Sequence, residues 1–214
     1  MTLELHYLPG SFYAWRVQLG LGHKGVPHEL KRVDFGAGDA KAGSYLAMNP
    51  RSKVPAMRDG DFTLYESAAI LEYLDDKYPD TPRLYPENVE QRARVRRMVC
   101  EIDNYWFPHA LQMAMNLYFK PDEADWNEAE ITDAQAGMFA ELKYYEGQIS
   151  EDTFFGEMTA AEYALYPMLA HTARFDLRRP SLGFKDAIGP KVRKLMNKVE
   201  AQPFFADTFP AHWK

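Results

Sequence analysis

Two short stretches carry residues whose types and spacing suit the binding of an α-amino acid. Val54-Pro55 puts a proline at the start of a predicted strand, where its missing N–H requires an edge or a special backbone. A cis bond at this proline would turn the neighbouring backbone groups outward. Glu66-Ser67 precedes a predicted helix, whose free N–H groups and dipole favour a carboxylate, and Glu66 adds an acceptor for an ammonium group.

Ser11 is the strongest candidate for chemistry. Its hydroxyl follows a predicted strand and stands at the N-cap of a predicted helix, a position that favours an anion such as a thiolate. A free thiol has a pKa of about 8.5, and each unit of lowering needs about 1.4 kcal/mol. A hydroxyl hydrogen bond to a charged group contributes roughly 1.5–3 kcal/mol. Hydroxyl and helix dipole together can therefore ionise a bound thiol at pH 7.

The elements that must position these residues follow from hydrophobic periodicity and turn signals. Asp59-Gly60 predicts a hairpin between two short strands, and Pro79 ends the helix that follows. This order, βαβαββα, predicts a small mixed sheet flanked by helices. The predicted strands are 2–7, 28–35, 54–57 and 62–64, and the predicted helices are 12–24, 39–48 and 68–78.

A proline-punctuated linker over 80–86 separates this domain, 1–79, from an all-α domain over 87–214. The first long helical stretch, 87–119, is predicted to be one bent helix or two helices, with Pro108 marking the bend. Thr159-Ala160-Ala161-Glu162 reads as a capping box at a helix start. The other predicted helices cover 127–149, 159–175, 190–200 and 204–209.

Composition excludes several classes of protein. A net charge of −6 argues against nucleic acid, and neither a basic block nor a long apolar run suggests a membrane. The chain start does not read as a signal peptide, and the single Cys100 suits a reducing cytoplasm. The six histidines show no metal-ligand spacing, so no metal is expected.

These motifs resemble those of the cytosolic glutathione transferases. The Val-Pro strand start, the hairpin and "ESAAILEYL" are similar to the family's thioredoxin-like domain. Residues 11–17, SFYAWRV, resemble the "S…RV" signature of serine-type, phi/theta/zeta-like members of bacterial style. Residues 156–162 resemble the folding signature of the family's helical domain, with Glu162 in place of the usual Asp. The resemblance covers nearly the whole chain.

The resemblance implies roles for the residues above. Glutathione is the expected co-substrate: its backbone pairs with the Val54 main chain beside Pro55, and its γ-glutamyl end is held by Glu66 and Ser67. Ser11 matches the catalytic serine. Two tyrosines are rivals for thiol activation, Tyr13 ranking second and Tyr7 third. No cysteine lies near Ser11, which argues against the glutaredoxin-like members.

Three charged residues complete the expected glutathione site. Lys41 and Lys53 are candidates for the glycine carboxylate and the peptide backbone, although Lys53 stands where many serine-type members carry glutamine, and either lysine could be a solvated surface charge. The family resemblance implies a homodimer in which Asp103, chosen over Glu101, reaches the γ-glutamyl amine bound by the partner. Arginines at 92–97 and acidic residues at 72–76 offer opposite charges for such an interface.

A second, apolar substrate is expected where the two domains meet. Aromatic and methionine side chains suit an adaptable pocket, but at 14% aromatic content about half of the candidates are expected to be core. His109 is either a general acid or a structural histidine. The candidates for the pocket wall are Phe12, Tyr13, Tyr105, Trp106, His109, Met113 and Tyr166.

Three functions follow from this sequence. The first is a cytoplasmic glutathione transferase of the detoxifying type, which adds the glutathione thiolate to an electrophile. The second is a transferase-like scaffold that has lost the chemistry and binds a protein partner, for which Trp213 and the many aromatics leave room. The third is isomerase or reductive work on a glutathione adduct in the same site.

Overall fold

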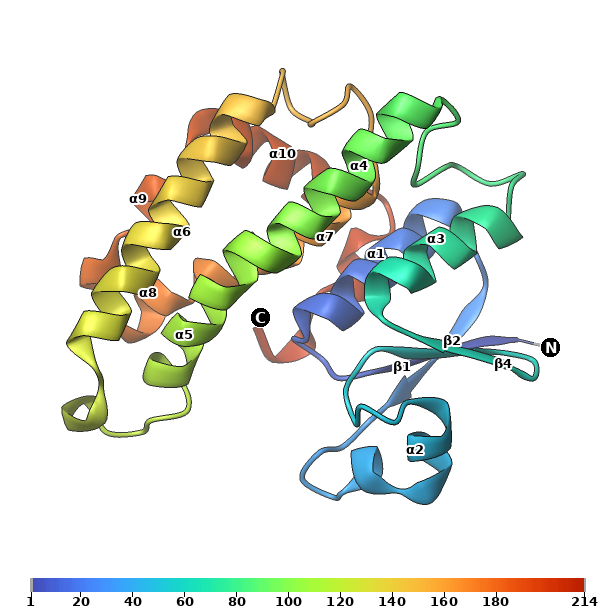
Figure 1. Cartoon of the computed structure of the whole chain (residues 1–214), viewed down its shortest axis with the longest axis horizontal. Helices are drawn as coiled ribbons and strands as arrows, with labels where there is room; N and C mark the ends of the chain where they lie inside the picture. Colours follow the sequence, from blue (N-terminus) through green and yellow to red (C-terminus); the bar gives the residue numbers. More distant parts are fainter. Residues whose placement is uncertain (1, 214) are drawn as a thin grey trace. The chain divides into compact units, whose positions relative to one another are not determined.

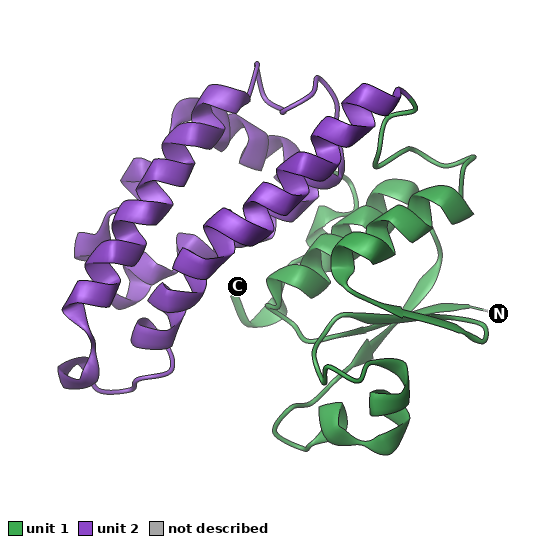
Figure 2. Ribbon diagram, viewed as in Figure 1, with its two compact units in different colours: residues 1–87, 201–214 green, residues 88–200 purple. Residues whose placement is uncertain are grey.

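The computed structural model describes residues 2–213 and divides into two compact units. Unit 1 comprises residues 1–87 together with 201–214, and unit 2 comprises residues 88–200 (Figure 2). The end of the chain, which the sequence places with the helical region 87–214, therefore packs in unit 1. Among the described residues no helix is both long enough and apolar enough to cross a bilayer.

Unit 1 is built on the predicted four-stranded mixed sheet. Its strands lie in the order β2-β1-β3-β4, with β1 and β2 parallel and the other neighbours antiparallel. Helices α1 and α3 cover one face, while α2 and the turn η1 lie on the other (Figure 1). The elements are β1 (Leu3–Tyr7), α1 (Phe12–Lys24), β2 (His28–Arg32), η1 (Asp39–Lys41), α2 (Gly43–Met48), β3 (Ala56–Asp59), β4 (Phe62–Tyr65) and α3 (Ser67–Lys77).

The alternation of side chains along the strands gives each face of the sheet its own core. Leu3 and Leu5 of β1 point to the α1 and α3 side, where they pack with Val17 and Leu74. Ala56 of β3 belongs to a smaller cluster on the α2 side. Each of these fully buried aliphatic side chains contributes roughly 1.5–3 kcal/mol, so the larger cluster holds α1 and α3 against the sheet.

A buried ion pair fastens the two helices to the segment that follows them. The Lys24 ammonium lies 2.9 Å from the Asp75 carboxylate, and both side chains are almost fully buried. Asp75 also accepts hydrogen bonds from the backbone N–H groups of Leu84 and Tyr85, at 2.8 and 3.1 Å. Because a single lost partner would leave a buried charge unpaired, this cluster fixes α1, α3 and the second half of the linker in one arrangement.

The last stretch of the chain packs against α1. It contains α11 (Phe205–Thr208) and the turn η5 (Ala211–Trp213). The indole N–H of Trp15 donates to the Thr208 hydroxyl at 3.0 Å. Gly10 has a φ of +85°, which favours glycine, and a Cβ there would lie in tight contact with the His212 ring, at 3.1 Å.

Unit 2 is helical throughout, as predicted. The expected bend at Pro108 is replaced by a turn of π-helix, η2 (Ile102–Trp106), that ends before the proline, and Pro108 stands in the first turn of the next helix. Its helices are α4 (Val89–Glu101), α5 (Phe107–Leu117), α6 (Glu128–Gln148), α7 (Ala160–Thr172), α8 (Phe175–Arg178), α9 (Phe184–Ala187) and α10 (Pro190–Glu200), with the 3₁₀ turns η3 (Glu123–Asp125) and η4 (Pro180–Leu182).

The predicted capping box is present at the start of α7. The Glu162 carboxylate accepts from the Thr159 N–H at 2.7 Å, the Thr159 hydroxyl at 2.6 Å and the Phe154 N–H at 2.8 Å. Burial raises the pKa of Glu162, and these donors act in the opposite direction because they favour the ionised carboxylate. The box therefore ties the loop before α7 to the first turn of the helix.

Candidate active site

Ser11 caps α1 directly after the first strand. Its backbone is extended, with φ at −70° and ψ at 120°, and its hydroxyl accepts a long hydrogen bond of 3.4 Å from the Ala14 N–H. A turn holds the residue in place, because the Ser11 N–H donates to the Leu8 carbonyl at 3.1 Å. The hydroxyl hydrogen has no acceptor among the described residues. Ser11 can therefore donate to an anion at the start of the helix.

The Val54-Pro55 bond is cis, as the sequence analysis expected. The Lys53 carbonyl just before it accepts from the Tyr45 hydroxyl at 2.6 Å and the Asn49 side-chain amide at 2.7 Å. Burial raises the pKa of Tyr45 to about 12, so its hydroxyl remains a donor at neutral pH. The backbone groups of Val54 make no hydrogen bond within the described part of the chain, and so they can pair with an extended ligand.

Glu66 and Ser67 form the start of α3. Glu66 has a left-handed backbone, with φ at +68°, and its exposed side chain does not cap the helix. Ser67 is buried, and its hydroxyl oxygen accepts from the Arg16 guanidinium at 2.8 Å. The Ser67 O–H remains a donor. This helix start thus presents a carboxylate, a hydroxyl and backbone N–H groups to a ligand that carries an ammonium group and a carboxylate.

Arg16 is a site residue whose role the sequence analysis did not assign. It is only 2% exposed, and its guanidinium lies 4.7 Å from the centre of the Tyr13 ring. Through its bond to Ser67 it joins the start of α1 to the start of α3, and so joins Ser11 to the Glu66-Ser67 pair. One feature of the sequence could have identified Arg16 as a site residue. It is the arginine of the "S…RV" stretch and lies on a helix with few other charges.

The other predicted residues of unit 1 are more peripheral. Lys41 and Lys53 are exposed, so both side chains can reach outward toward an anion. Tyr13 is half-buried beside Arg16. Tyr7 ends β1 and packs against the larger core cluster. Tyr13 thus contacts a residue that links the two helix starts.

The candidates in unit 2 divide between surface and core. Met113, Trp106 and Tyr166 are buried, and the Tyr166 hydroxyl donates to Glu200 at 2.9 Å. Tyr105 is 60% exposed, and the half-buried His109 ring fits over Gly137, where a Cβ would approach it to 2.4 Å.

The two acidic candidates lie close together in the chain. Asp103 lies half-buried in the π turn η2. Glu101, at the end of α4, accepts from Tyr144 at 3.0 Å and pairs with Arg97. Within residues 2–213 no group of three or more histidine, cysteine or acidic side chains is placed to hold a metal ion.

Comparison with known proteins identifies the family. Residues 5–82 match the model of the glutathione S-transferase N-terminal domain. A glutathione S-transferase of Silene vulgaris is 32% identical over 162 residues, which cover 73% of this chain and 74% of that protein. The chain belongs to the glutathione S-transferase family.

Two further relatives extend the likeness over nearly the whole chain. A probable maleylacetoacetate isomerase of Vibrio cholerae is 27% identical to this chain. The match covers 98% of this chain and 96% of the Vibrio cholerae protein. A glutathione transferase family member from Pseudomonas fluorescens, solved with two glutathione bound, has a TM-score of 0.86 at 21% identity, covering 98% and 92% of the two chains. That likeness confirms the predicted fold, a thioredoxin-like domain followed by a helical one.

Proposed function

We propose that this family member is a glutathione transferase that binds glutathione on unit 1 and activates its thiol with Ser11. The observation that carries the proposal is the convergence of three features on one unit. These are a serine hydroxyl at the start of α1, a cis Val54-Pro55 and an uncapped α3 start with Glu66 and Ser67. Because the chain belongs to the glutathione S-transferase family, we take glutathione as the ligand that these features bind.

Each part of the tripeptide has a partner of matching chemistry. The γ-glutamyl ammonium binds the Glu66 carboxylate, and its carboxylate accepts from the Ser67 hydroxyl and the N–H groups that begin α3. The central backbone pairs with Val54 in the manner of an added strand. The glycine carboxylate lies within the field of the exposed Lys53 and Lys41.

Ser11 then acts on the cysteinyl sulfur. Its O–H donates to the thiolate, and the positive end of α1 adds to the stabilisation. Lowering the thiol pKa from about 8.5 to about 6.5 needs about 2.7 kcal/mol, which a charge-assisted hydrogen bond and the dipole together supply. The thiol proton passes to solvent, and the sulfur lone pair forms a C–S bond to carbon of the electrophile, while a halide leaves with its bonding pair or the π electrons of an activated double bond move onto its electron-withdrawing group.

The second substrate is proposed to be electrophilic and largely apolar. Four of the proposed contacts are half-buried or exposed and therefore reachable by a ligand: Phe12, Tyr13, Tyr105 and His109. Met113 and Tyr166 are buried within unit 2, so their contribution is to the packing of that unit. We further propose a homodimer in which Asp103 serves the partner's bound γ-glutamyl amine, since a half-buried carboxylate in an irregular helical turn is suited to such a contact.

Isomerisation of a glutathione adduct is the second candidate function. The near-complete coverage of the Vibrio cholerae protein, whose name is that of a probable maleylacetoacetate isomerase, favours it. The same activated thiolate would add to the substrate, allow rotation about the former double bond and leave again, so the glutathione is regenerated.

Calorimetric titration with reduced glutathione tests the proposal directly. We expect one site per chain and a bound thiol whose ultraviolet thiolate absorbance appears at lower pH than that of free glutathione. S-Methylglutathione, which lacks the ionisable thiol, is the matched control for binding without ionisation. No heat and no thermal shift at millimolar glutathione would favour the scaffold function. Turnover of an aryl halide against turnover of maleylacetoacetate then separates conjugation from isomerisation.

A further inference from the structure

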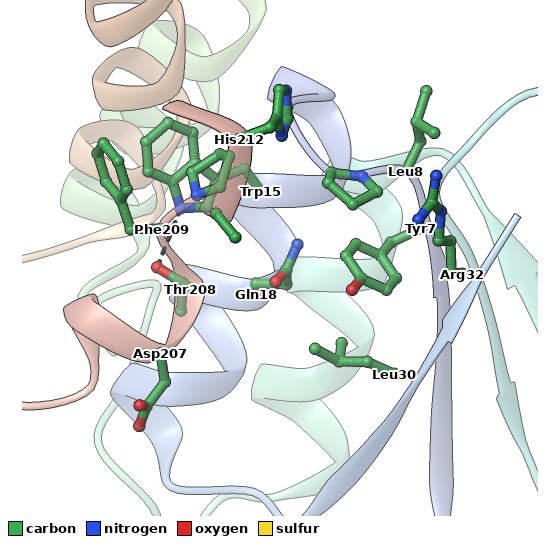
Figure 3. Close-up of a pocket in the computed structure, with 14 residues that line it drawn as sticks. Tyr7, Leu8, Trp15, Gln18, Leu30, Arg32, Asp207, Thr208, Phe209 and His212 are labelled. Atoms are coloured by element: carbon green, nitrogen blue, oxygen red, sulfur yellow. Dashed lines mark hydrogen bonds between the residues drawn. The ribbon is translucent and has the colours of Figure 1, made fainter. Parts of the chain in front are cut away.

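A cavity in unit 1 is lined by residues other than Ser11 and the proposed glutathione-binding residues. It has a volume of about 470 Å³ and lies between the end of β1, helix α1, strand β2 and the last stretch of the chain (Figure 3). This volume falls in the range of roughly 300–1,000 Å³ that small-molecule sites occupy. Neither Ser11, Val54 nor Glu66 lines it.

The topology of the sheet explains why a cavity forms here. Strand β2 is an edge strand, and its Leu30 and Arg32 point to the same face because side chains alternate along a strand. Arg32 stands opposite Tyr7 in the parallel register. Leu30 is 41% exposed, so α1 leaves this margin of the sheet uncovered, and the chain end supplies the opposite wall with Phe209.

The walls of the cavity are fixed. Trp15, 1% exposed, contacts the Phe209 ring edge-on at 5.7 Å between centroids. Its indole N–H holds the Thr208 hydroxyl at 3.0 Å, as the dashed line in Figure 3 shows. The cavity is therefore bounded by a preformed apolar surface of tryptophan, phenylalanine and leucine rather than by a loose loop.

Gln18 is the polar group that points to a ligand. Its side chain is 6% exposed, yet its amide has no hydrogen-bond partner among the described residues and lines the cavity (Figure 3). The Gln18 amide borders the cavity, so its donor and acceptor are available to a molecule bound there. The Tyr7 hydroxyl likewise has no hydrogen-bond partner among the described residues and faces the same space (Figure 3). Both groups can be satisfied by an oxygen on a bound molecule.

Charge at the rim defines the anion that fits. The Arg32 guanidinium is exposed and makes no ion pair within the described part of the chain. Asp207 lies away from it, across the cavity (Figure 3). An anion is therefore attracted at one end and repelled at the other, which limits the ligand to one acidic group.

We propose that this cavity binds a small aromatic monocarboxylic acid carrying a further oxygen. The ring system packs on Trp15, Leu30 and Phe209. The carboxylate pairs with Arg32, and the second oxygen exchanges hydrogen bonds with the Gln18 amide and the Tyr7 hydroxyl. Binding here leaves the glutathione contacts untouched, so acid and glutathione occupy the protein together.

Calorimetry with 1-naphthoate tests the proposed pairing of the ligand carboxylate with Arg32. The full-length protein is first saturated with S-hexylglutathione, which fills the proposed thiol site and the space next to it. We expect one naphthoate per chain, and a loss of about tenfold or more in affinity for Arg32→Leu, since a charge-assisted pair contributes about 1.5–3 kcal/mol. The matched control is Arg51→Leu, an exposed arginine of the same unit outside the cavity, which should bind as wild type.

4-Hydroxy-1-naphthoate tests the polar half. It should bind more tightly than 1-naphthoate in the wild type, and Gln18→Leu should abolish that advantage while it keeps the midpoint of thermal unfolding. Three outcomes would overturn the proposal: no binding heat at millimolar acid, displacement of the acid by S-hexylglutathione, or equal loss in the Arg32 and Arg51 variants. Displacement would place the acid in the thiol site without contradicting the proposed transferase function.

Discussion

Three helix starts of unit 2 are capped by side chains, whereas the two helix starts that carry the candidate site in unit 1 are uncapped or weakly capped. In unit 2, α4 and α6 begin with Asn88 and Asn127, each of whose side-chain oxygens accepts from two backbone N–H groups. Helix α7 begins with the buried Thr159–Glu162 box. In unit 1, α3 has no side-chain cap, and α1 has a single long bond to Ser11.

This difference separates stability from ligand binding. A helix start that is satisfied by its own side chains gains roughly 0.5–2 kcal/mol and has little left to offer an anion. A start that lacks such a cap forgoes that gain and presents its N–H groups outward. We therefore expect substitutions at the helix starts of unit 2 to affect folding, and those at the helix starts of unit 1 to affect glutathione.

The largest effect is expected for Glu162→Ala. The change removes three hydrogen bonds and leaves the N–H groups of Phe154 and Thr159 buried without a partner. The free energy of unfolding should fall by about 3 kcal/mol or more, measured by urea denaturation. Glu157→Ala, an exposed glutamate in the same loop, is the control. A loss below about 1 kcal/mol in the free energy of unfolding would contradict the claim that the helix caps of unit 2 serve stability.

The double variant Glu66→Ala, Ser67→Ala should act mainly on binding. Losing the counter-charge and a hydroxyl donor should weaken glutathione by about 30- to 100-fold, or roughly 2–3 kcal/mol. Calorimetry measures the affinity, and Glu66→Ala alone serves as a control for folding because that side chain is exposed. If the double variant binds glutathione as tightly as the wild type, α3 does not hold the γ-glutamyl end.

Ser11→Ala should leave the fold intact and raise the pKa of bound glutathione. The thiolate loses one donor, so the pKa should move up by about 1–2 units, or about 1.4–2.7 kcal/mol. Thiolate absorbance against pH gives the value, with Tyr7→Phe and Tyr13→Phe as matched removals of a hydroxyl. An unchanged profile for Ser11→Ala combined with a shift for Tyr13→Phe would transfer the role to Tyr13.

The interior of unit 2 should also be the more sensitive to acid. Burial, together with the nearby Arg174 charge, lowers the pKa of His171 to about 4, against a usual 6.5. The unfolded chain then binds a proton that the folded one does not, so this stability is present above pH 6.5 and is lost as the pH falls toward 4. Urea denaturation should show that the free energy of unfolding of His171→Phe depends less on pH than that of the wild type. Between pH 6.5 and 4 the variant should lose about 1–2 kcal/mol less. An equally steep profile in the variant would assign the acid sensitivity to other groups.

The smallest effect is expected for Asp103→Asn. If the carboxylate serves the partner's glutathione, affinity should fall by about three- to fivefold, as for a partly screened charge. Sedimentation at low micromolar concentration should show the dimer mass for both proteins. A monomer at low and high salt would reject the homodimer, whereas unchanged affinity in a dimeric variant would leave Asp103 with a surface role.

Local signals in the sequence were enough to predict much of unit 1. Glycine, proline and the alternation of apolar residues predicted the order of strands and helices, including the hairpin. Val54-Pro55 pointed to the cis bond that the structure contains. The capping box at Thr159 was readable because its two partners lie three residues apart.

Contacts between distant parts of the chain were not predictable in this way. Arg16 meets Ser67 across 51 positions, and no local pattern shows that an arginine in a helix is buried. The bend near Pro108 was expected at the proline, but the chain changes to π geometry beforehand and lets the proline begin a regular helix. The cavity beside Trp15 depends on the chain end returning to α1, which only the tertiary structure reveals.

That return of the chain end has a consequence for synthesis. Residues 1–87 leave the ribosome first, but residues 201–214, which complete their packing, follow only after all of unit 2. At about 5–20 residues per second, roughly 6–23 s separate the two parts of unit 1. During that interval Trp15 lacks the Thr208 and Phe209 contacts of the finished protein. We therefore expect the nascent amino-terminal segment to expose Trp15 until residues 205–209 have been made.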